Sequence, residues 1–177
     1  DLQSVVYVCD VDYVMVVNAE SRYRTLGDLL AAARAKPGQL SYMSTGQNGP
    51  LHVGTEYLTK RAGVKRIHVP YKGEAPAYGD LISGRIDVAV MTVPFTKPQI
   101  AAGKLRPIAT ISAQRARGMP NVPSVAEQGF PGYAVPIWNG LSVSAHSAAG
   151  LSGCAPCRLR CHGHSASIPH AFAPAAL

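Results

Sequence analysis

Short apolar runs alternate with helix-like segments along the first 146 residues, and this alternation limits the possible folds more than any other feature. Runs such as VAV within residues 86–90 and IHV within residues 66–69 suit strands that are buried on both faces of a sheet. Helix-forming segments at residues 51–62 and 75–83 each end at a glycine. The pattern predicts an α/β fold with a mainly parallel sheet and helices on both faces.

Further elements follow from the same pattern. Thr25 is predicted to cap a helix over residues 26–35, and Asp28 at the third helical position completes a capping box. The β-branched runs 5–9 and 13–17 form one bent strand or two. Beyond residue 112 the sequence is rich in proline and glycine. We expect only a short SVAEQ helix there, followed by an extended segment that crosses to another lobe.

The sequence LSYMSTGQNGPLH, residues 40–52, is typical of a strand, a glycine-rich turn and the start of a helix. Pro50 suits the first helical turn, where backbone N–H groups have no intrahelical acceptor. Glycines let the backbone approach a ligand closely, so the turn is a candidate anion site, although an ordinary loop has the same pattern. Because parallel strands end at one edge of a sheet, residues 44–49, 70–73 and 91–94 are expected to share one rim.

The composition narrows the function classes. Of the 177 residues, 47% are hydrophobic and 15% are charged, which is typical of a globular protein, and no apolar run reaches the length of a membrane span. The formal net charge is +7, yet lysines and arginines do not cluster, so no nucleic-acid partner is expected. The chain opens at Asp1 with neither a methionine nor a signal peptide, which indicates a mature or truncated product.

The sequence holds no G-x-S-x-G elbow, Walker loop, H-E-x-x-H motif or paired carboxylates. We therefore predict a binding protein with no catalytic residue, metal or cofactor. His52 is expected to donate to a bound carboxylate or to brace the turn, and Tyr71 to cover a ligand or to cap the sheet end. His68 is expected to be structural. The alternative is a small hydrolase or phosphate-binding enzyme that uses the helix start as its anion site.

The composition changes near residue 147. Residues 147–177 contain no Asp, Glu or Lys and lack regular periodicity, which we interpret as an irregular, out-of-frame tail. A zinc or redox module is the alternative, because thiols and imidazoles, which suit zinc, gather in this tail. They are Cys154, Cys157, Cys161, His162 and His164.

Four motifs in this order resemble one protein family: HVPYKGEAPAYGDLISGRIDV, GKLRPIATISAQR, MPNVPSVAEQGFPGY and WNGLSV. The family is that of the solute-binding proteins of tripartite tricarboxylate transporters, also called the Bug family. The resemblance implies a periplasmic receptor with the two α/β lobes of a type II periplasmic-binding-protein fold. Such a receptor clamps a small carboxylate solute and serves the membrane components of the transporter. Only the second lobe and its crossovers are recognisable, so residues 1–146 are expected to be one solute-binding lobe with crossover strands.

The resemblance also implies a ligand site. The expected ligand-binding residues are Ser44, Thr45, Gly46, Gln47, Asn48, Gly49, His52, Tyr71 and Thr92. Gly49 stands where the family often has a hydroxyl residue, which removes one expected ligand donor. Met91-Thr92 stand where the family often has an Asp-Asn pair, and the loss of that acidic group argues against amino- or amide-bearing ligands and leaves simple carboxylates or no ligand. Half a clamp is expected to bind weakly. The apolar crossover strands near residues 5–17 and 138–143 are expected to be exposed and prone to association.

Overall fold

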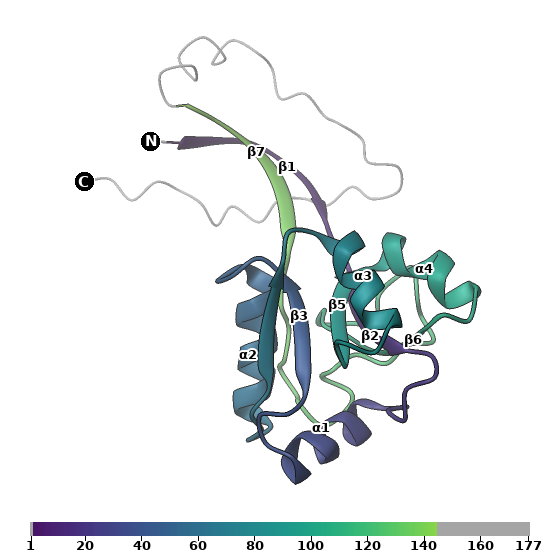
Figure 1. Ribbon diagram of the computed structural model, residues 1–177. Coiled ribbons are helices and arrows are strands. Elements are labelled where there is room, and N and C mark those ends of the chain that lie inside the picture. Colours follow the sequence, from purple (N-terminus) through teal and green to yellow (C-terminus); the bar gives the residue numbers. More distant parts are fainter. Residues whose placement is uncertain (1, 145–177) are drawn as a thin grey trace. The chain divides into compact units, whose positions relative to one another are not determined.

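The structure, a computed structural model, describes residues 2–144 (Figure 1). These residues divide into two units, one made of residues 11–137 and the other of residues 2–10 and 138–144. The predicted boundary at residue 147 and the cysteines that follow it lie outside the described residues. The element order is β1 (Leu2–Asp10), β2 (Tyr13–Asn18), α1 (Leu26–Ala35), β3 (Ser41–Thr45), α2 (Pro50–Arg61), β4 (Ile67–Tyr71), α3 (Glu74–Ile82), β5 (Val88–Thr92), α4 (Val93–Ala101), β6 (Leu105–Thr110) and β7 (Trp138–Ser144).

A five-stranded sheet forms the centre of the larger unit, in the order β4-β3-β5-β2-β6. β3 pairs in parallel with both β4 and β5, whereas β2 lies antiparallel between β5 and β6. Four of the five strands therefore point in one direction, which confirms the predicted α/β class with a mainly parallel sheet. The reversed direction of β2 is not evident from its sequence, because parallel and antiparallel strands use the same apolar residues.

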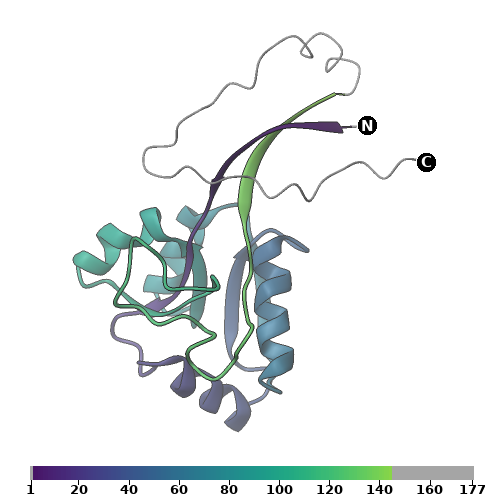
Figure 2. The ribbon, with the colours of Figure 1, turned by 180° about the vertical axis from the view of Figure 1, so that it is seen from behind.

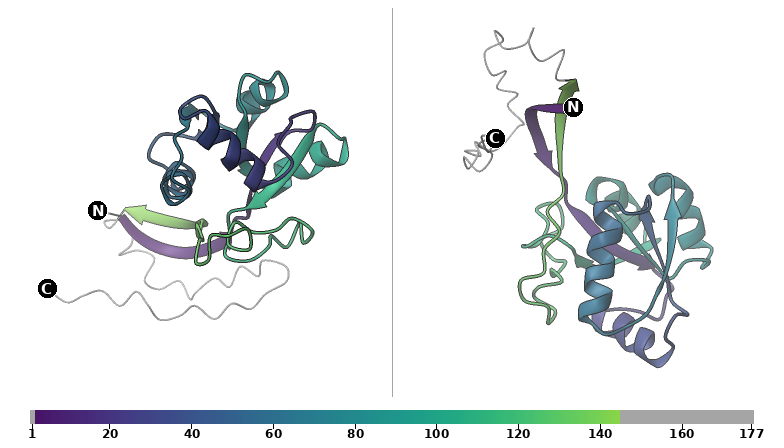
Figure 3. Two further views of the ribbon diagram at one scale, coloured as in Figure 1. Left: turned by 90° about the horizontal axis from the view of Figure 1, so that it is seen from below. Right: turned by 90° about the vertical axis from the view of Figure 1, so that its left-hand side faces the viewer.

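Helices cover both faces of this sheet, as the apolar strands predict. On β2, the side chains of Met15 and Val17 belong to the same core as those of α1 and α2. The side chains of Val14 and Val16 belong to a second core with those of α3. Neighbouring side chains of a strand point to opposite faces, so burial of both faces explains why β2 is apolar along its length. Views from behind (Figure 2) and from two further sides (Figure 3) show α1 and α2 apart from α3 and α4.

The helices begin close to their expected positions. Asp28 N–H donates to Thr25 Oγ1 at 3.1 Å, and Thr25 N–H donates to Asp28 Oδ2 at 3.0 Å, which confirms the capping box of α1. α2 begins one residue before its expected start, and so does α3, a difference that is usual at helix ends. Among the described residues, no helix combines the length and apolar character needed to span a membrane.

The segment between β6 and β7 has no helix, so the prediction of a short SVAEQ helix is wrong. Ser124 and Glu127 do exchange capping bonds: Ser124 N–H donates to Glu127 Oε2 at 2.8 Å, and Glu127 N–H donates to Ser124 Oγ at 3.3 Å. The chain leaves this turn at Gly129, whose φ of +98° is incompatible with a continuing helix. Two buried anchors, Val125 and Tyr133, hold the segment against the larger unit's core.

The smaller unit is an antiparallel ribbon of β1 and β7. Its large side chains are exposed, by 58% for Trp138, 56% for Leu141 and 41% for Tyr7, which confirms the expected exposure near residues 138–143. The corresponding expectation fails for β2, whose residues 14–17 are fully buried. The reason is that β2 lies between two strands and beneath helices on both faces.

Candidate functional site

The carboxyl ends of β3, β4 and β5 meet at one edge of the sheet, here called the rim (residues 44–49, 70–74 and 91–93). Gly46 N–H donates to Tyr71 O at 3.1 Å, so the exits of β3 and β4 are joined. β3 pairs in parallel with β5, and Thr92 at the end of β5 donates two hydrogen bonds to Glu74, which follows β4. The three segments that were expected to share a rim therefore lie side by side.

The turn between β3 and α2 is the most open part of the rim. Gly46 and Asn48 have positive φ angles of 86° and 60°, and both residues are exposed. Gly49 is the N-cap residue of α2 and makes no side-chain capping bond. The first-turn amides of Leu51 and His52 have no acceptor within the helix. The turn can therefore present backbone N–H groups to an anion.

Two histidines hold this turn in place. His52 Nδ1 accepts a hydrogen bond from Asn48 N–H at 3.1 Å. His68 Nε2 lies 2.7 Å from Ser44 Oγ, and Ser44 Oγ donates to Gly46 O at 3.1 Å. The two imidazole rings stack with their centroids 3.9 Å apart. Of the two roles expected for His52, this geometry favours bracing the turn.

Two of the expected ligand residues point into the protein. Ser44 is fully buried, and its hydroxyl is used by the contacts to His68 and Gly46. Tyr71 OH donates to Asp80 Oδ2 on α3 at 2.6 Å; burial first, and then this hydrogen bond, raise the pKa of Tyr71 to about 12. Ser44 thus positions the turn and Tyr71 caps the end of the sheet. Neither hydroxyl is directed at the open side of the rim.

The remaining expected residues surround the turn. Gln47 is exposed, and Thr45 and Gly49 are half-buried next to it. A Cβ atom at Gly49 would lie 3.3 Å from Thr45 O, so the close approach of these two backbones favours glycine. Thr92, half-buried, ends β5 and precedes α4.

A carboxylate that the sequence did not single out also lies at the rim. Glu74, the first residue of α3, accepts a hydrogen bond from Thr92 N–H at 2.7 Å and another from Thr92 Oγ1 at 2.9 Å. Its signal in the sequence is an acidic residue directly after VPYKG. That signal is weak, because acidic residues are common in the first turn of helices, where they interact favourably with the helix dipole.

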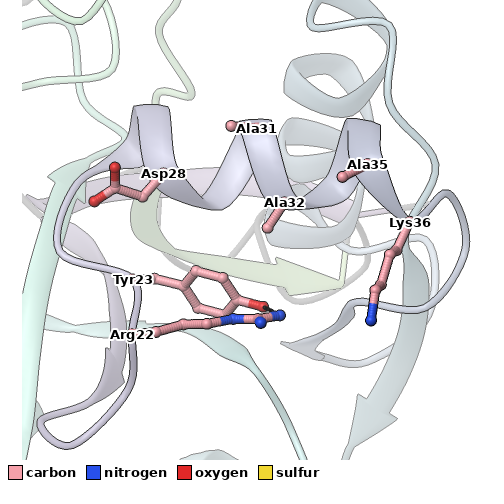
Figure 4. Close-up of a pocket in the computed structure, with 7 residues that line it drawn as sticks. All are labelled: Arg22, Tyr23, Asp28, Ala31, Ala32, Ala35 and Lys36. Carbon is pink, nitrogen blue, oxygen red and sulfur yellow. Dashed lines mark hydrogen bonds between the residues drawn. The ribbon is translucent and has the colours of Figure 1, made fainter.

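Two hollows on the described surface lie away from the rim. The larger, about 370 Å³, is an open depression beside α1, where Arg22 and Tyr23 lie next to the helix and Lys36 flanks them (Figure 4). The smaller, about 210 Å³, lies near Asn18, where β2 ends. Both occur at the edge of the sheet opposite to the rim.

Acidification is expected to weaken the fold through His68. Burial, and then the proximity of His52, lower the pKa of His68 below its ordinary value of 6.5. The unfolded chain therefore protonates His68 at a higher pH than the folded chain does. The stability that neutral His68 contributes is complete above about pH 6.5 and is lost as the pH falls toward the lower folded-state pKa.

The measurement is the urea midpoint of unfolding at several values between about pH 7.5 and 5, where histidine is the main side chain to titrate. We expect the midpoint to fall with pH, and to fall less steeply in His68→Gln. Histidines that do not contact His68 contribute equally to both proteins, so the difference between the two slopes reports on His68 together with its stacked partner His52. Identical slopes would contradict the lowered pKa.

The chain is similar in sequence to known bacterial proteins. It is 39% identical over 142 residues to the UPF0065 protein in the tcbD-tcbE intergenic region of a Pseudomonas species, a match that covers 80% of this chain and 42% of that protein. It is 33% identical over 138 residues to Protein BugT of Bordetella pertussis, with 78% of this chain and 42% of that protein covered. The chain therefore spans about two fifths of the length of these relatives.

The fold has counterparts among solved structures. R. palustris Rpa4515 with adipate matches with a TM-score of 0.76 and 30% identity, over 85% of this chain and 52% of that chain. The sequence model of a protein family, the tripartite tricarboxylate transporter family receptor, matches residues 1–149 of the 177-residue chain. Together with the motifs in the sequence, these matches show that the chain belongs to the tripartite tricarboxylate transporter receptor family.

Proposed function

We propose that this chain forms one lobe of a periplasmic receptor that binds small carboxylates and delivers them to the membrane components of a tripartite tricarboxylate transporter. Membership of the receptor family supports this proposal, as does the likeness to R. palustris Rpa4515, whose structure is described with adipate. The observation that carries it is the open turn at the start of α2, which offers N–H groups to an anion.

The available donors in this turn can be identified. The N–H groups of Gly46 and Asn48 already donate to Tyr71 O and His52 Nδ1. The donors that remain for a carboxylate are the N–H groups of Gln47, of Gly49 and of the first turn of α2, together with the side-chain amide of Gln47. In this proposal Gly46, Asn48 and His52 shape the turn, and the neighbouring amides bind the ligand.

A catalytic role has one feature in its favour, the short contact between Ser44 and His68, because a base beside a hydroxyl is the arrangement of an activated nucleophile. Ser44 is fully buried, so its hydroxyl has no access to a substrate. We therefore assign the pair a structural role and propose no enzymatic activity. Esterase and phosphatase assays are expected to show no turnover above background, and turnover that is lost in Ser44→Ala would overturn this assignment.

The zinc alternative concerns residues 154–164, which lie outside the described residues. Within residues 2–144, no group of three potential metal ligands comes together. Metal analysis of the purified chain, with Cys154→Ser as the control, distinguishes a zinc module from a chain that carries no stoichiometric metal.

The proposal predicts weak binding of adipate at the turn. Titration of the ¹⁵N-labelled chain with adipate at millimolar concentrations is expected to shift the amide signals of Gln47, Gly49, Leu51 and His52. One lobe supplies only part of the contacts, so we expect a dissociation constant of about 1 mM or weaker, which corresponds to about 4 kcal/mol of binding free energy or less. Calorimetry at micromolar adipate is then expected to give no saturable heat.

Two glycine variants form a matched control. Gly46 and Gly103 both have positive φ angles, and a Cβ atom at either would meet no atom within 4 Å. Gly46→Ala and Gly103→Ala therefore introduce similar backbone strain, of about 1 kcal/mol. Only Gly46→Ala is expected to reduce the adipate-induced shifts, since Gly103 precedes β6 at the opposite edge of the sheet. Equal losses in both variants, or shifts concentrated around Arg22, would refute the assignment of the site.

A further inference from the structure

The carboxylate of Glu74 accepts the hydrogen bonds that Thr92 can donate at the end of β5. Its Oε1 accepts from Thr92 N–H at 2.7 Å and its Oε2 accepts from Thr92 Oγ1 at 2.9 Å, so both oxygens face the same residue. A ligand that reaches the end of β5 therefore meets a fixed negative charge there. It does not meet the free N–H and hydroxyl of Thr92.

This charge lies close to the proposed carboxylate site. β3 lies between β4 and β5, so Glu74, which follows β4 and bonds to Thr92 at the end of β5, reaches across the end of β3, where the turn begins. Neighbouring strands are about 4.8 Å apart, so the Glu74 carboxylate is on the order of 8 Å from the turn. A ligand of four or five carbon atoms that is held by the turn at one end covers part of that distance, so its far end can lie closer to Glu74 than its bound carboxylate does.

No ion pair that involves Glu74 is found among the described residues. The ion pairs among the described residues join Arg85 to Asp80 and Arg115 to Glu127. Lys72, the nearest lysine along the chain, is exposed. Tyr13 pairs with Thr92, and burial first, and then the negative charge of Glu74, raise the pKa of Tyr13.

We infer that Glu74 sets the ligand preference of the rim, favouring a carboxylate whose far end carries an amino group or is uncharged over one whose far end is a second carboxylate. This inference rests on the proposed carboxylate site. It also corrects the expectation from Met91-Thr92 that the end of β5 lacks an acidic group, because α3 supplies one from the neighbouring segment. The sequence pattern could not show this, since Glu74 and Thr92 are 18 residues apart.

Three small ligands of similar length test the inference: butyrate, succinate and 4-aminobutyrate. Their affinities are measured on the full chain from the amide shifts of the turn, at low ionic strength, where the Debye length is about 30 Å. For unit charges about 8 Å apart at an effective dielectric constant of about 40–80, Coulomb's law corresponds to a change in affinity of about two- to sixfold. We expect 4-aminobutyrate to bind more tightly than succinate by at least this factor.

Glu74→Gln removes the charge and keeps an amide that can still accept from Thr92. Relative to butyrate, it is expected to strengthen succinate binding and weaken 4-aminobutyrate binding, each about two- to sixfold, because the carboxylate that all three ligands place at the turn cancels in this comparison. Glu20→Gln is the control, because it makes the same change in net charge at an exposed position after β2, at the opposite edge. A merely structural role of Glu74 would change all three affinities by the same factor.

The outcomes separate this inference from the function on which it rests. If none of the three ligands shifts the turn amides, the proposed carboxylate site is wrong. If the ligands bind at the turn but Glu74→Gln leaves their order unchanged, or Glu20→Gln has the same effect, the role of Glu74 is wrong and the site stands.

Discussion

Tyr133→Ala is expected to lower the free energy of unfolding by about 3–5 kcal/mol, as removal of a large buried ring usually does. Tyr133 is 1% exposed and packs in the core that contains α1 and α2. Its hydroxyl donates to Gly54 O on α2 at 3.0 Å, and its ring stacks on Tyr57 with centroids 5.9 Å apart. Urea unfolding followed by far-ultraviolet circular dichroism measures the loss.

Tyr133→Phe is the control, because it removes the hydroxyl and keeps the ring. Burial raises the pKa of Tyr133 to about 12, so the hydroxyl is protonated at neutral pH and can donate to Gly54 O. Loss of that hydrogen bond is expected to lower the free energy of unfolding by about 0.5–1.5 kcal/mol. If Tyr133→Ala costs no more than Tyr133→Phe, the segment between β6 and β7 does not stabilise the larger unit.

The regular part of the fold could be predicted because its signals are local. The Thr25 and Asp28 capping box lies within four residues, and the structure contains both of its hydrogen bonds. The strand β5 reads VAVMT, and its first four residues are buried, as a strand covered on both faces requires. Such features depend on neighbours in the sequence, so one sequence is sufficient to place them.

Features that depend on distant residues could not be predicted. The direction of β2 depends on its pairing with β5 and β6, which lie more than 70 residues later. The SVAEQ segment has the Ser124 and Glu127 capping pattern of a helix, but the anchors Val125 and Tyr133 and the turn at Gly129 hold it in a different conformation. Tertiary packing has overridden the local preference here.

The candidate site likewise combines features that local sequence could predict with features that depend on distant residues. The open turn was predictable, because a buried strand, two glycines and a proline specify a strand-to-helix junction within about ten residues. The inward orientation of Ser44 and Tyr71 depends on which face of the sheet each side chain meets. A shift of one residue in the strand would reverse both faces, so sequence alone does not decide which hydroxyls reach a ligand.

Gly54→Ala is expected to destabilise the protein although alanine favours helices. A Cβ atom at Gly54 would lie 2.5 Å from Val135 Cγ2 and 2.9 Å from Val135 Cγ1. The Cβ atom of Val135 itself would lie 3.2 Å away, so rotation of the side chain relieves only part of the contact. The backbone of Val135 is held by the bond from its N–H to Ile111 O at 3.0 Å. Overpacking of this kind costs about 1–3 kcal/mol. Offset by a gain of about 1 kcal/mol in helix propensity, this cost leaves an expected net loss of up to about 2 kcal/mol.

Gly79→Ala is the matched control and is expected to have the opposite sign. Gly79 lies within α3, and a Cβ atom there would meet no atom within 4 Å. Without a steric penalty, the substitution is expected to raise the free energy of unfolding by about 0.4–1 kcal/mol. Urea unfolding of both variants measures the difference. Stabilisation by both would mean that Val135 does not pack closely on α2, and the segment between β6 and β7 would then need a different anchor.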